Sequence, residues 1–139
     1  RARLLAEPAL LNSGVEEMLR WVTPVIHFRR TATKDVVLHG EQIKENDKVV
    51  LFYSSANRDE AVFDEPFHFD VTPTPNHHVA FGYGTHFCLG APLARMEALI
   101  ALPRLHRRFP KMSLAAPPDR WNDGLSLRGP GSIRVTLAR

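Results

Sequence analysis

The sequence is poor in cysteine, because Cys88 is the one cysteine among 139 residues. A single cysteine excludes an internal disulfide framework. Long apolar runs are also missing, since no stretch reaches the roughly 18 residues that a membrane-spanning helix needs. We therefore expect no membrane segment in this part of the protein, and no signal peptide is visible. Arg1 rather than Met opens the chain, within a helical pattern, so we expect an N-terminal part to precede it.

Strong charge of one sign is missing as well. The net charge is +3, and lysine and arginine form no dense block of the kind that nucleic-acid-binding tails carry. We therefore expect no nucleic-acid partner. Hydrophobic residues make up 44% of the chain and charged residues 24%, which is typical of one globular domain with a real core.

The pattern of apolar residues predicts two main helices and several short strands. Residues 13–16 (SGVE) match a capping box, so we expect a helix from Ser13 to about Val22 that ends before Pro24. Apolar residues three and four apart predict a long helix over residues 92–109. Strands are expected at 25–30, 35–38 and 48–53. A turn at 45–47 joins the last two, and His39-Gly40 is a further turn signal. Two more strands are expected within 125–137 around a Gly-Pro-Gly turn.

Residues 54–76 show no regular pattern. Phenylalanines are spread there among prolines and acidic residues. A loop of this length inside a compact domain is usually functional, so we expect it to be ordered.

The most informative motif is the run of residues 81–90 (FGYGTHFCLG), which contains Cys88. Three glycines, at 82, 84 and 90, allow sharp turns and a close approach of the backbone to a flat ligand. The thiol precedes a predicted helix, whose free N–H groups and dipole favour thiolate over thiol. A thiolate is the form that binds soft metals and electrophiles.

The residues alone leave several roles open for Cys88. A lone cysteine is most often a buried structural residue. A second role is that of a catalytic nucleophile with His86 or His78 as its base. A third is a zinc site made of His77, His78, His86 and Cys88, although these spacings match no trusted ligand pattern.

Glu17 and Arg20 lie three residues apart on the first main helix, so their side chains share one face and can pair. By spacing alone, an exposed ion pair of small energetic weight is the favoured interpretation. Four cations also gather near the end of the last helix: Arg104, Arg107, Arg108 and Lys111. They suit a helix C-terminus and would equally suit a surface that steers an acidic partner.

Taken together, these motifs resemble the cytochrome P450 family. The run 81–90 resembles its haem-binding loop, with Phe81, Gly84, Cys88 and Gly90 at the expected places. Glu17 and Arg20 resemble its Glu-x-x-Arg helix, at the right distance upstream. Further matches are a propionate-binding strand at 30–32, a meander with Asn57, Arg58, Asp59, Phe63, Pro66, Phe69 and Asp70, and the residues Pro75, Asn76 and 78–81.

The resemblance implies a mainly α fold with small β-sheets (α+β), of which this chain is the C-terminal portion of a single domain. The segments would be helices (1–23), β-strands (24–53), the meander (54–80), the haem-thiolate loop (81–91), the proximal helix (92–109) and a β-hairpin tail (110–139). Chains of the family are much longer, so the resemblance identifies this chain as a fragment that would be inactive when isolated.

The resemblance also implies the residues of the site. Cys88 is expected to be the catalytic thiolate and the axial ligand of the iron of haem b. Arg30 and His86 are expected to bind the haem propionates, with Arg29 as the rival of Arg30. Other residues beside the haem would be Phe81, Gly82, Gly90 and Ala91. The substrate pocket would include Val25, Ile26, His27 and Leu125.

A buried charge network is implied too. Glu17 and Arg20 are expected to join a third arginine from the meander, and breaking such a network is costly. The chain carries Pro73 at the position that we align with this arginine. We therefore expect that Arg58 or His68 substitutes, or that the network is reduced to a pair.

By resemblance, the protein is a monooxygenase that hydroxylates a lipophilic substrate with O₂. Electrons would come from NAD(P)H through a ferredoxin reductase and a ferredoxin, in the cytoplasm. Two alternatives stay open. One is a peroxygenase driven by peroxide, and the other is a truncated remnant that binds haem, or merely folds, without turnover.

Overall fold

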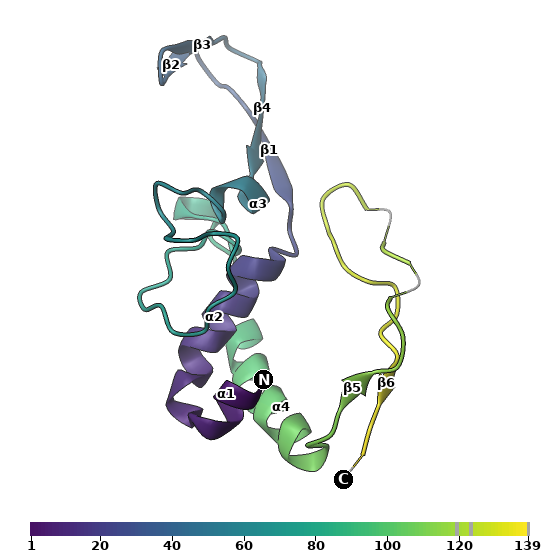
Figure 1. The fold of residues 1–139 in the computed structure, drawn as a ribbon. Coiled ribbons are helices and arrows are strands. Elements are labelled where there is room, and N and C mark those ends of the chain that lie inside the picture. The colour runs from purple at the N-terminus through teal and green to yellow at the C-terminus, as the bar shows by residue number, and fades with distance from the viewer. Residues whose placement is uncertain (119, 123, 139) are drawn as a thin grey trace.

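The computed structural model describes residues 1–118, 120–122 and 124–138. Helices form the body of the molecule, and a narrow β-ladder extends from it (Figure 1). The helices are α1 (Ala2–Ala6), α2 (Leu11–Val22), α3 (Tyr53–Ala56) and α4 (Ala91–Arg108), with 3-10 turns η1 (Pro8–Leu10) and η2 (Gly84–His86). The strands are β1 (His27–Thr31), β2 (Val36–Leu38), β3 (Glu41–Ile43), β4 (Lys48–Phe52), β5 (Ser113–Leu114) and β6 (Val135–Thr136). The predicted combination of helices with small sheets is confirmed.

Helix α2 begins at Leu11 rather than at Ser13. Pro8 opens the 3-10 turn η1, which runs directly into α2 and supplies its first turn. Ser13 therefore lies inside the helix, where its hydroxyl donates to the carbonyl of Val71 (2.6 Å) and lies 3.1 Å from that of Leu10. The predicted capping box at 13–16 is wrong, because the helix has already started when the chain reaches Ser13.

The end of α2 agrees with the prediction. Thr23 follows the helix in a left-handed conformation (φ 40°), and its N–H donates to the carbonyl of Leu19 (2.9 Å). This conformation is unusual for a β-branched residue. Two hydrogen bonds hold it, because the buried hydroxyl of Thr23 donates to the carbonyl of Arg20 (2.6 Å) and accepts from Nδ2 of Asn57 (2.8 Å).

Two antiparallel strand pairs form the ladder in Figure 1: β1 pairs with β4, and β2 pairs with β3. The strands predicted at 35–38 and 48–53 are present, but the prediction is incomplete, since β3 lies between them and was not expected. The reason is a tight turn at His39 and Gly40, which have φ values of 48° and 87°. This two-residue turn returns the chain at once to pair with β2, which leaves β4 free to pair with β1.

The C-terminal segment pairs mostly with itself, and one bridge joins it to the chain after α2. β5 pairs with β6, and single bridges join Val25 to Leu127 and Trp121 to Pro130. Of the two strands predicted within residues 125–137, β6 is present, whereas the chain before the Gly-Pro-Gly turn forms only the single bridge at Leu127. The backbone of the Gly-Pro-Gly turn is already bonded to residues 120–122, so its two flanks take separate partners.

The interior is small and partly polar. Between α3 and η2, residues 57–83 contain no helix or strand, as predicted for most of this region, and they wrap over α2, which packs on α4 (Figure 1). The buried hydrophobic residues are Leu4, Val15, Tyr53, Val71, Ala80 and Ala91, and the buried polar residues are Glu17, Arg20, Thr23 and Asn57. Hydrogen bonds must therefore organise this interior, because buried polar groups need partners. Among the described residues, no helix is both long and apolar enough to cross a membrane.

Candidate functional site

One cavity of about 450 Å³ collects most of the residues that the sequence singles out. Its lining residues are Leu19, Pro24, Val25, Phe28, Arg30, Tyr53, Ala80, Phe81, Gly82, His86 and Cys88. Most of this wall is apolar, and the chemically active groups are the guanidinium of Arg30, the imidazole of His86 and the thiol of Cys88. A mostly apolar cavity with a few convergent polar groups is typical of a site for a cofactor or small molecule.

Strand β1 decides which arginine faces the cavity. Side chains alternate between the two faces of a strand, so Phe28 and Arg30 share one face, and the Arg30 guanidinium lies 5.8 Å from the centre of the Phe28 ring. Both residues line the cavity. His27 and Arg29 take the opposite face, where His27 stacks on Phe52 with ring centres 5.5 Å apart. The structure thus places Arg30, and not Arg29, in the cavity wall.

The loop of residues 81–90, here called the Cys88 loop, is closed at its base by the N–H of Cys88, which donates to the carbonyl of Phe81 (2.8 Å). Gly82 adopts φ 76°, a conformation that favours glycine. A Cβ at Gly82 would lie 3.4 Å from the hydroxyl of Tyr53, and one at Gly90 would lie 3.9 Å from Sγ of Cys88. Gly82 thus leaves the Tyr53 hydroxyl uncrowded, and Gly90 presents no side chain to the thiol. Helix α4 starts directly after the loop, at the fully buried Ala91.

The structure separates the alternatives for Cys88. The thiol is exposed and lines the cavity, so Cys88 is not a buried structural cysteine. Nε2 of His78 lies 3.0 Å from Oε2 of Glu16, so this ring is engaged away from the thiol, whereas His86 lines the same cavity as Cys88. In the described part of the chain, no three His, Cys, Asp or Glu side chains gather in a way that could hold a metal ion, and the zinc alternative is wrong.

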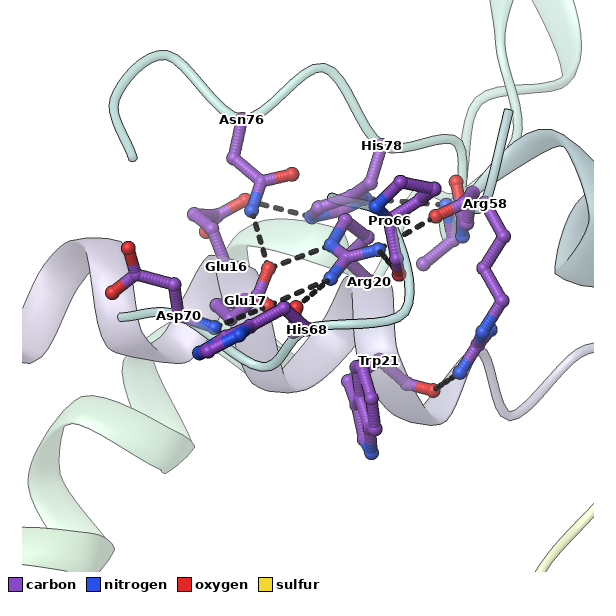
Figure 2. Close-up of polar contacts among 12 residues, drawn as sticks. Glu16, Glu17, Arg20, Trp21, Arg58, Pro66, His68, Asp70, Asn76 and His78 are labelled. Atoms are coloured by element: carbon purple, nitrogen blue, oxygen red, sulfur yellow. Dashed lines mark hydrogen bonds and ion pairs between the residues drawn. The ribbon is translucent and has the colours of Figure 1, made fainter. Parts of the chain in front are cut away.

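Glu17 and Arg20 form a buried ion pair on α2 (Figure 2). Nε of Arg20 donates to Oε2 of Glu17 (2.7 Å) and Nη2 donates to Oε1 (2.8 Å). Glu17 is 2% exposed and Arg20 is 3% exposed. The interpretation as an exposed pair is wrong, because spacing along a helix says nothing about what covers it. Arg20 also donates to the carbonyls of Asn57 (2.9 Å), Pro66 (2.9 Å) and His68 (3.1 Å).

Asn76 supplies the third side chain of this network. Its Nδ2 donates to Oε2 of Glu17 (3.1 Å), and the backbone N–H of Asp70 donates to Oε1 (3.0 Å). Figure 2 shows Asn76 reaching the carboxylate from the chain that passes over α2. The expectation that the side chain of Arg58 or His68 completes the network is therefore wrong. A neutral amide and a backbone N–H satisfy the carboxylate instead.

Arg58 takes a different place. Its Nη2 donates to the carbonyl of Trp21 (2.8 Å), and its guanidinium lies 5.1 Å from the centre of the indole ring. Burial, and then the positive charge of Arg20, lower the pKa of Arg58. A second cation beside Arg20 is unfavourable once Glu17 is already paired, which explains why Arg58 bonds a carbonyl and an aromatic face.

Asn57 is completely buried and joins three segments. Its Nδ2 donates to Oγ1 of Thr23 (2.8 Å), its Oδ1 accepts from the N–H of Val79 (2.7 Å), and its carbonyl accepts from Arg20 (2.9 Å). Thr23 precedes the chain that forms one wall of the cavity, and Val79 precedes the Cys88 loop. One amide thus fixes two walls of the cavity relative to each other. This role was not predicted from the sequence, in which Asn57 stood out only as part of the Asn-Arg-Asp match to the family.

Of the four residues expected in a substrate pocket, Val25 lines the cavity and the other three do not. Ile26 is fixed by its backbone, since its N–H donates to the carbonyl of Ser126 (2.8 Å). His27 faces away on β1, and Leu125 is 86% exposed. These three residues therefore do not line this cavity, and their place in a substrate pocket stays a prediction.

The basic residues at the end of α4 lie far from Cys88 along the helix. Arg104 and Arg108 are 13 and 17 residues beyond Ala91, which is about 20–25 Å at 1.5 Å per residue. Nε of Arg107 donates to the carbonyl of Pro103 (3.3 Å), and the Arg108 guanidinium lies 5.9 Å from the Phe109 ring centre. These positions favour the interpretation as cations that complement the helix C-terminus.

Comparisons with known proteins identify the family of this chain. The family model of cytochrome P450 matches residues 3–136. The steroid C26-monooxygenase of Mycolicibacterium smegmatis is 48% identical over 96% of this chain and 34% of its own length. The mycinamicin IV hydroxylase/epoxidase of Micromonospora griseorubida is 45% identical over 97% of this chain and 35% of its own length.

A solved structure shows the same arrangement of elements. The cytochrome P450 PksS of the Bacillus subtilis 168 bacillaene polyketide synthase superposes with a TM-score of 0.93 at 40% identity, over 99% of this chain and 36% of that one. The chain thus spans about a third of the length of the relatives that it matches. Because the family model and the superposition both extend over nearly every residue, the chain belongs to the cytochrome P450 family.

Proposed function

We propose that the complete protein is a haem-thiolate monooxygenase and that this chain supplies its thiolate. The observation that carries the proposal is the convergence on one mostly apolar cavity of His86 and Cys88, from the Cys88 loop, with Arg30, which lies more than 50 residues earlier on β1. A soft anionic ligand, two donors for carboxylates and an apolar wall are what haem b requires. The residues present therefore fit that cofactor.

Each residue has a distinct task in this proposal. Cys88 binds the iron as a thiolate, and a thiolate ligand favours O–O cleavage, which is the chemistry that the bound haem supplies. Arg30 and His86 orient the cofactor by charge-assisted hydrogen bonds to its propionates. Phe81 and Phe28 cover apolar surface and exclude water from the sulfur. Gly82, Gly90 and Ala91 let the chain pass close to the ligand without a side chain larger than methyl.

A lipophilic substrate is part of the same proposal. The cavity wall is mostly apolar, and two relatives are named for reactions on steroids and on mycinamicin IV. We further propose that electrons pass from NAD(P)H through a ferredoxin reductase and a ferredoxin, in the cytoplasm, where a free thiol stays reduced. The cations near the end of α4 are a poor place for the donor to dock, because they lie far along the helix from Cys88.

The test is the ferrous–CO spectrum of the complete protein. We expect the band of thiolate-ligated haem in the natural protein and its loss in Cys88→Ala and Cys88→His. His77→Ala removes an exposed histidine near the loop and serves as the control. A thiolate band that survives in Cys88→Ala would refute the assignment.

Turnover distinguishes the remaining alternatives. A monooxygenase needs NAD(P)H with a ferredoxin and its reductase, whereas a peroxygenase oxidises a test steroid with peroxide alone. Haem binding without turnover under either condition would identify a protein that holds the cofactor without catalysis.

A further inference from the structure

Glu16 lies next to the Glu17 network on α2 but points to different partners. Its carboxylate receives both donor groups of the Arg95 fork, from Nε to Oε1 (2.6 Å) and from Nη2 to Oε2 (2.7 Å). The same Oε2 lies 3.0 Å from Nε2 of His78. The three residues, here called the Glu16 cluster, join helix α2, helix α4 and the chain that enters the Cys88 loop.

The hydrogen bonds define the state of the histidine. The backbone N–H of Ala80 donates to Nδ1 of His78 (3.2 Å), so Nδ1 must be an unprotonated acceptor. Nε2 then carries the proton and donates it to Glu16. The His78 side chain is 2% exposed, so a buried neutral ring links the carboxylate to the backbone of a residue that lines the cavity.

The cluster reaches both flanks of the Cys88 loop. His78 lies just before Phe81, where the loop begins, and Arg95 lies on the first turns of α4, after Cys88. The Arg95 guanidinium is also 4.8 Å from the centre of the Phe81 ring. Because the N–H of Cys88 donates to the carbonyl of Phe81 (2.8 Å), any shift of Phe81 relative to α4 is transmitted to the thiol.

We propose that Glu16 is a positioning residue for the Cys88 thiolate. Glu16 holds the two flanks of the Cys88 loop together and balances the charge of Arg95. The proposal rests on the assignment of Cys88 as the haem ligand. Outer groups of this kind tune a metal site through geometry and local charge. The Arg95–Glu16 bond favours the charged carboxylate and lowers the pKa of Glu16, so both charges are present at neutral pH.

The two charges predict effects of opposite sign on the haem reduction potential. Glu16→Gln leaves Arg95 uncompensated, and added positive charge favours the reduced iron, so the potential rises. Arg95→Gln leaves Glu16 uncompensated, so the potential falls. The double variant restores the balance and returns close to the natural value. A purely structural role would move both single variants in the same direction, through loosening of the loop.

The experiment measures this potential in the complete haem-loaded protein at low salt. Asp35→Asn is the matched control, because it also removes one carboxylate from an ion pair, with Lys44, on the hairpin side of the β-ladder. It should leave the potential unchanged. Amide exchange at Cys88 is the second measurement, and it should be faster in Glu16→Gln and in Arg95→Gln than in the control.

The outcomes distinguish a failure of the haem assignment from a failure of the role of Glu16. If the natural protein lacks the thiolate–CO band, both the haem assignment and the role of Glu16 fail. If the band is present but the two single variants shift the potential in the same direction, or Asp35→Asn shifts it as Glu16→Gln does, the role of Glu16 alone is refuted. If Glu16→Gln does not fold, Glu16→Asp and Arg95→Gln carry the test. Glu16→Asp should then keep the natural potential and weaken haem retention, and an unchanged potential in Arg95→Gln would refute the role.

Discussion

The protonation of one buried histidine should be visible in the stability of the whole protein. Burial, as the largest cause, and the nearby charge of Arg95 lower the pKa of His78 from its ordinary value of 6.5, although Glu16 acts in the opposite direction. Between the lowered pKa and about 6.5, the unfolded chain binds a proton that the folded chain does not. Stability therefore falls as the pH drops below 6.5, by at most about 1.4 kcal/mol per pH unit for one group.

The measurement is the melting temperature of the complete protein from pH 7.5 to 5.5, compared with that of His78→Gln. The variant should show a weaker dependence on pH in this range. The pKa of Glu16 is lowered from 4.5, so its own contribution is lost only at more acidic pH and does not interfere. Identical pH profiles for the two proteins would mean that His78 titrates normally. His77→Gln, at an exposed position, controls for the change of residue type.

Sequence reasoning found some of these residues and missed others, for a physical reason. The resemblance pointed to Cys88, Arg30 and His86, and all three line one cavity. It did not identify Glu16, and it matched Asn76 without predicting its bond to Glu17. Carboxylates and amides are common on exposed surfaces, and only the tertiary fold brings these two against partners about 60 residues away.

Because side chains alternate between the two faces of β1, the neighbouring residues Arg29 and Arg30 should differ in their effect on haem binding. Arg30 lines the cavity and Arg29 faces away. Arg30→Ala should remove a charge-assisted hydrogen bond worth roughly 1.5–3 kcal/mol, and haem affinity should fall by about one to two powers of ten. Arg29→Ala should leave haem affinity unchanged, and a haem titration of both variants measures the difference. A larger loss in Arg29→Ala would place β1 in a register that is wrong by one residue.

The positions of the strands were easier to predict than the way in which the strands pair. Runs of β-branched and aromatic residues marked β1 and β4, but nothing local showed that they pair with each other. β3 (Glu41–Ile43) escaped because its sequence, Glu-Gln-Ile, is too polar and short to form a pattern. Helix α4 was predicted within one residue of its bounds, since 18 residues carry enough repeats of the helical period to be read locally.

At the scale of the whole molecule, the surface is larger than the mass predicts. A compact monomer of 15.7 kDa would expose about 7,300 Å², whereas this chain exposes 10,261 Å². Large hydrophobic residues along α4 contribute to this exposed surface, among them Leu93 (54% exposed), Met96 (52%) and Ile100 (47%). Apolar surface of this extent is normally covered by other protein.

We therefore expect the 139-residue chain, expressed by itself, to bind the dye ANS strongly and to melt without a sharp cooperative transition. The complete protein is the control, and it should bind little dye and melt cooperatively. A cooperative transition of the 139 residues with low dye binding would show that the chain buries its own apolar surface in solution.

The turn between β2 and β3 has a practical consequence. His39 and Gly40 form the tip of the hairpin at the far end of the β1–β4 ladder (Figure 1), and a Cβ added at Gly40 would meet nothing within 4 Å. A fluorescent reporter or affinity tag inserted between these two residues would be carried away from the helices and from the thiol. The hairpin thus offers an attachment point from which the arrival of an electron donor or substrate can be followed optically.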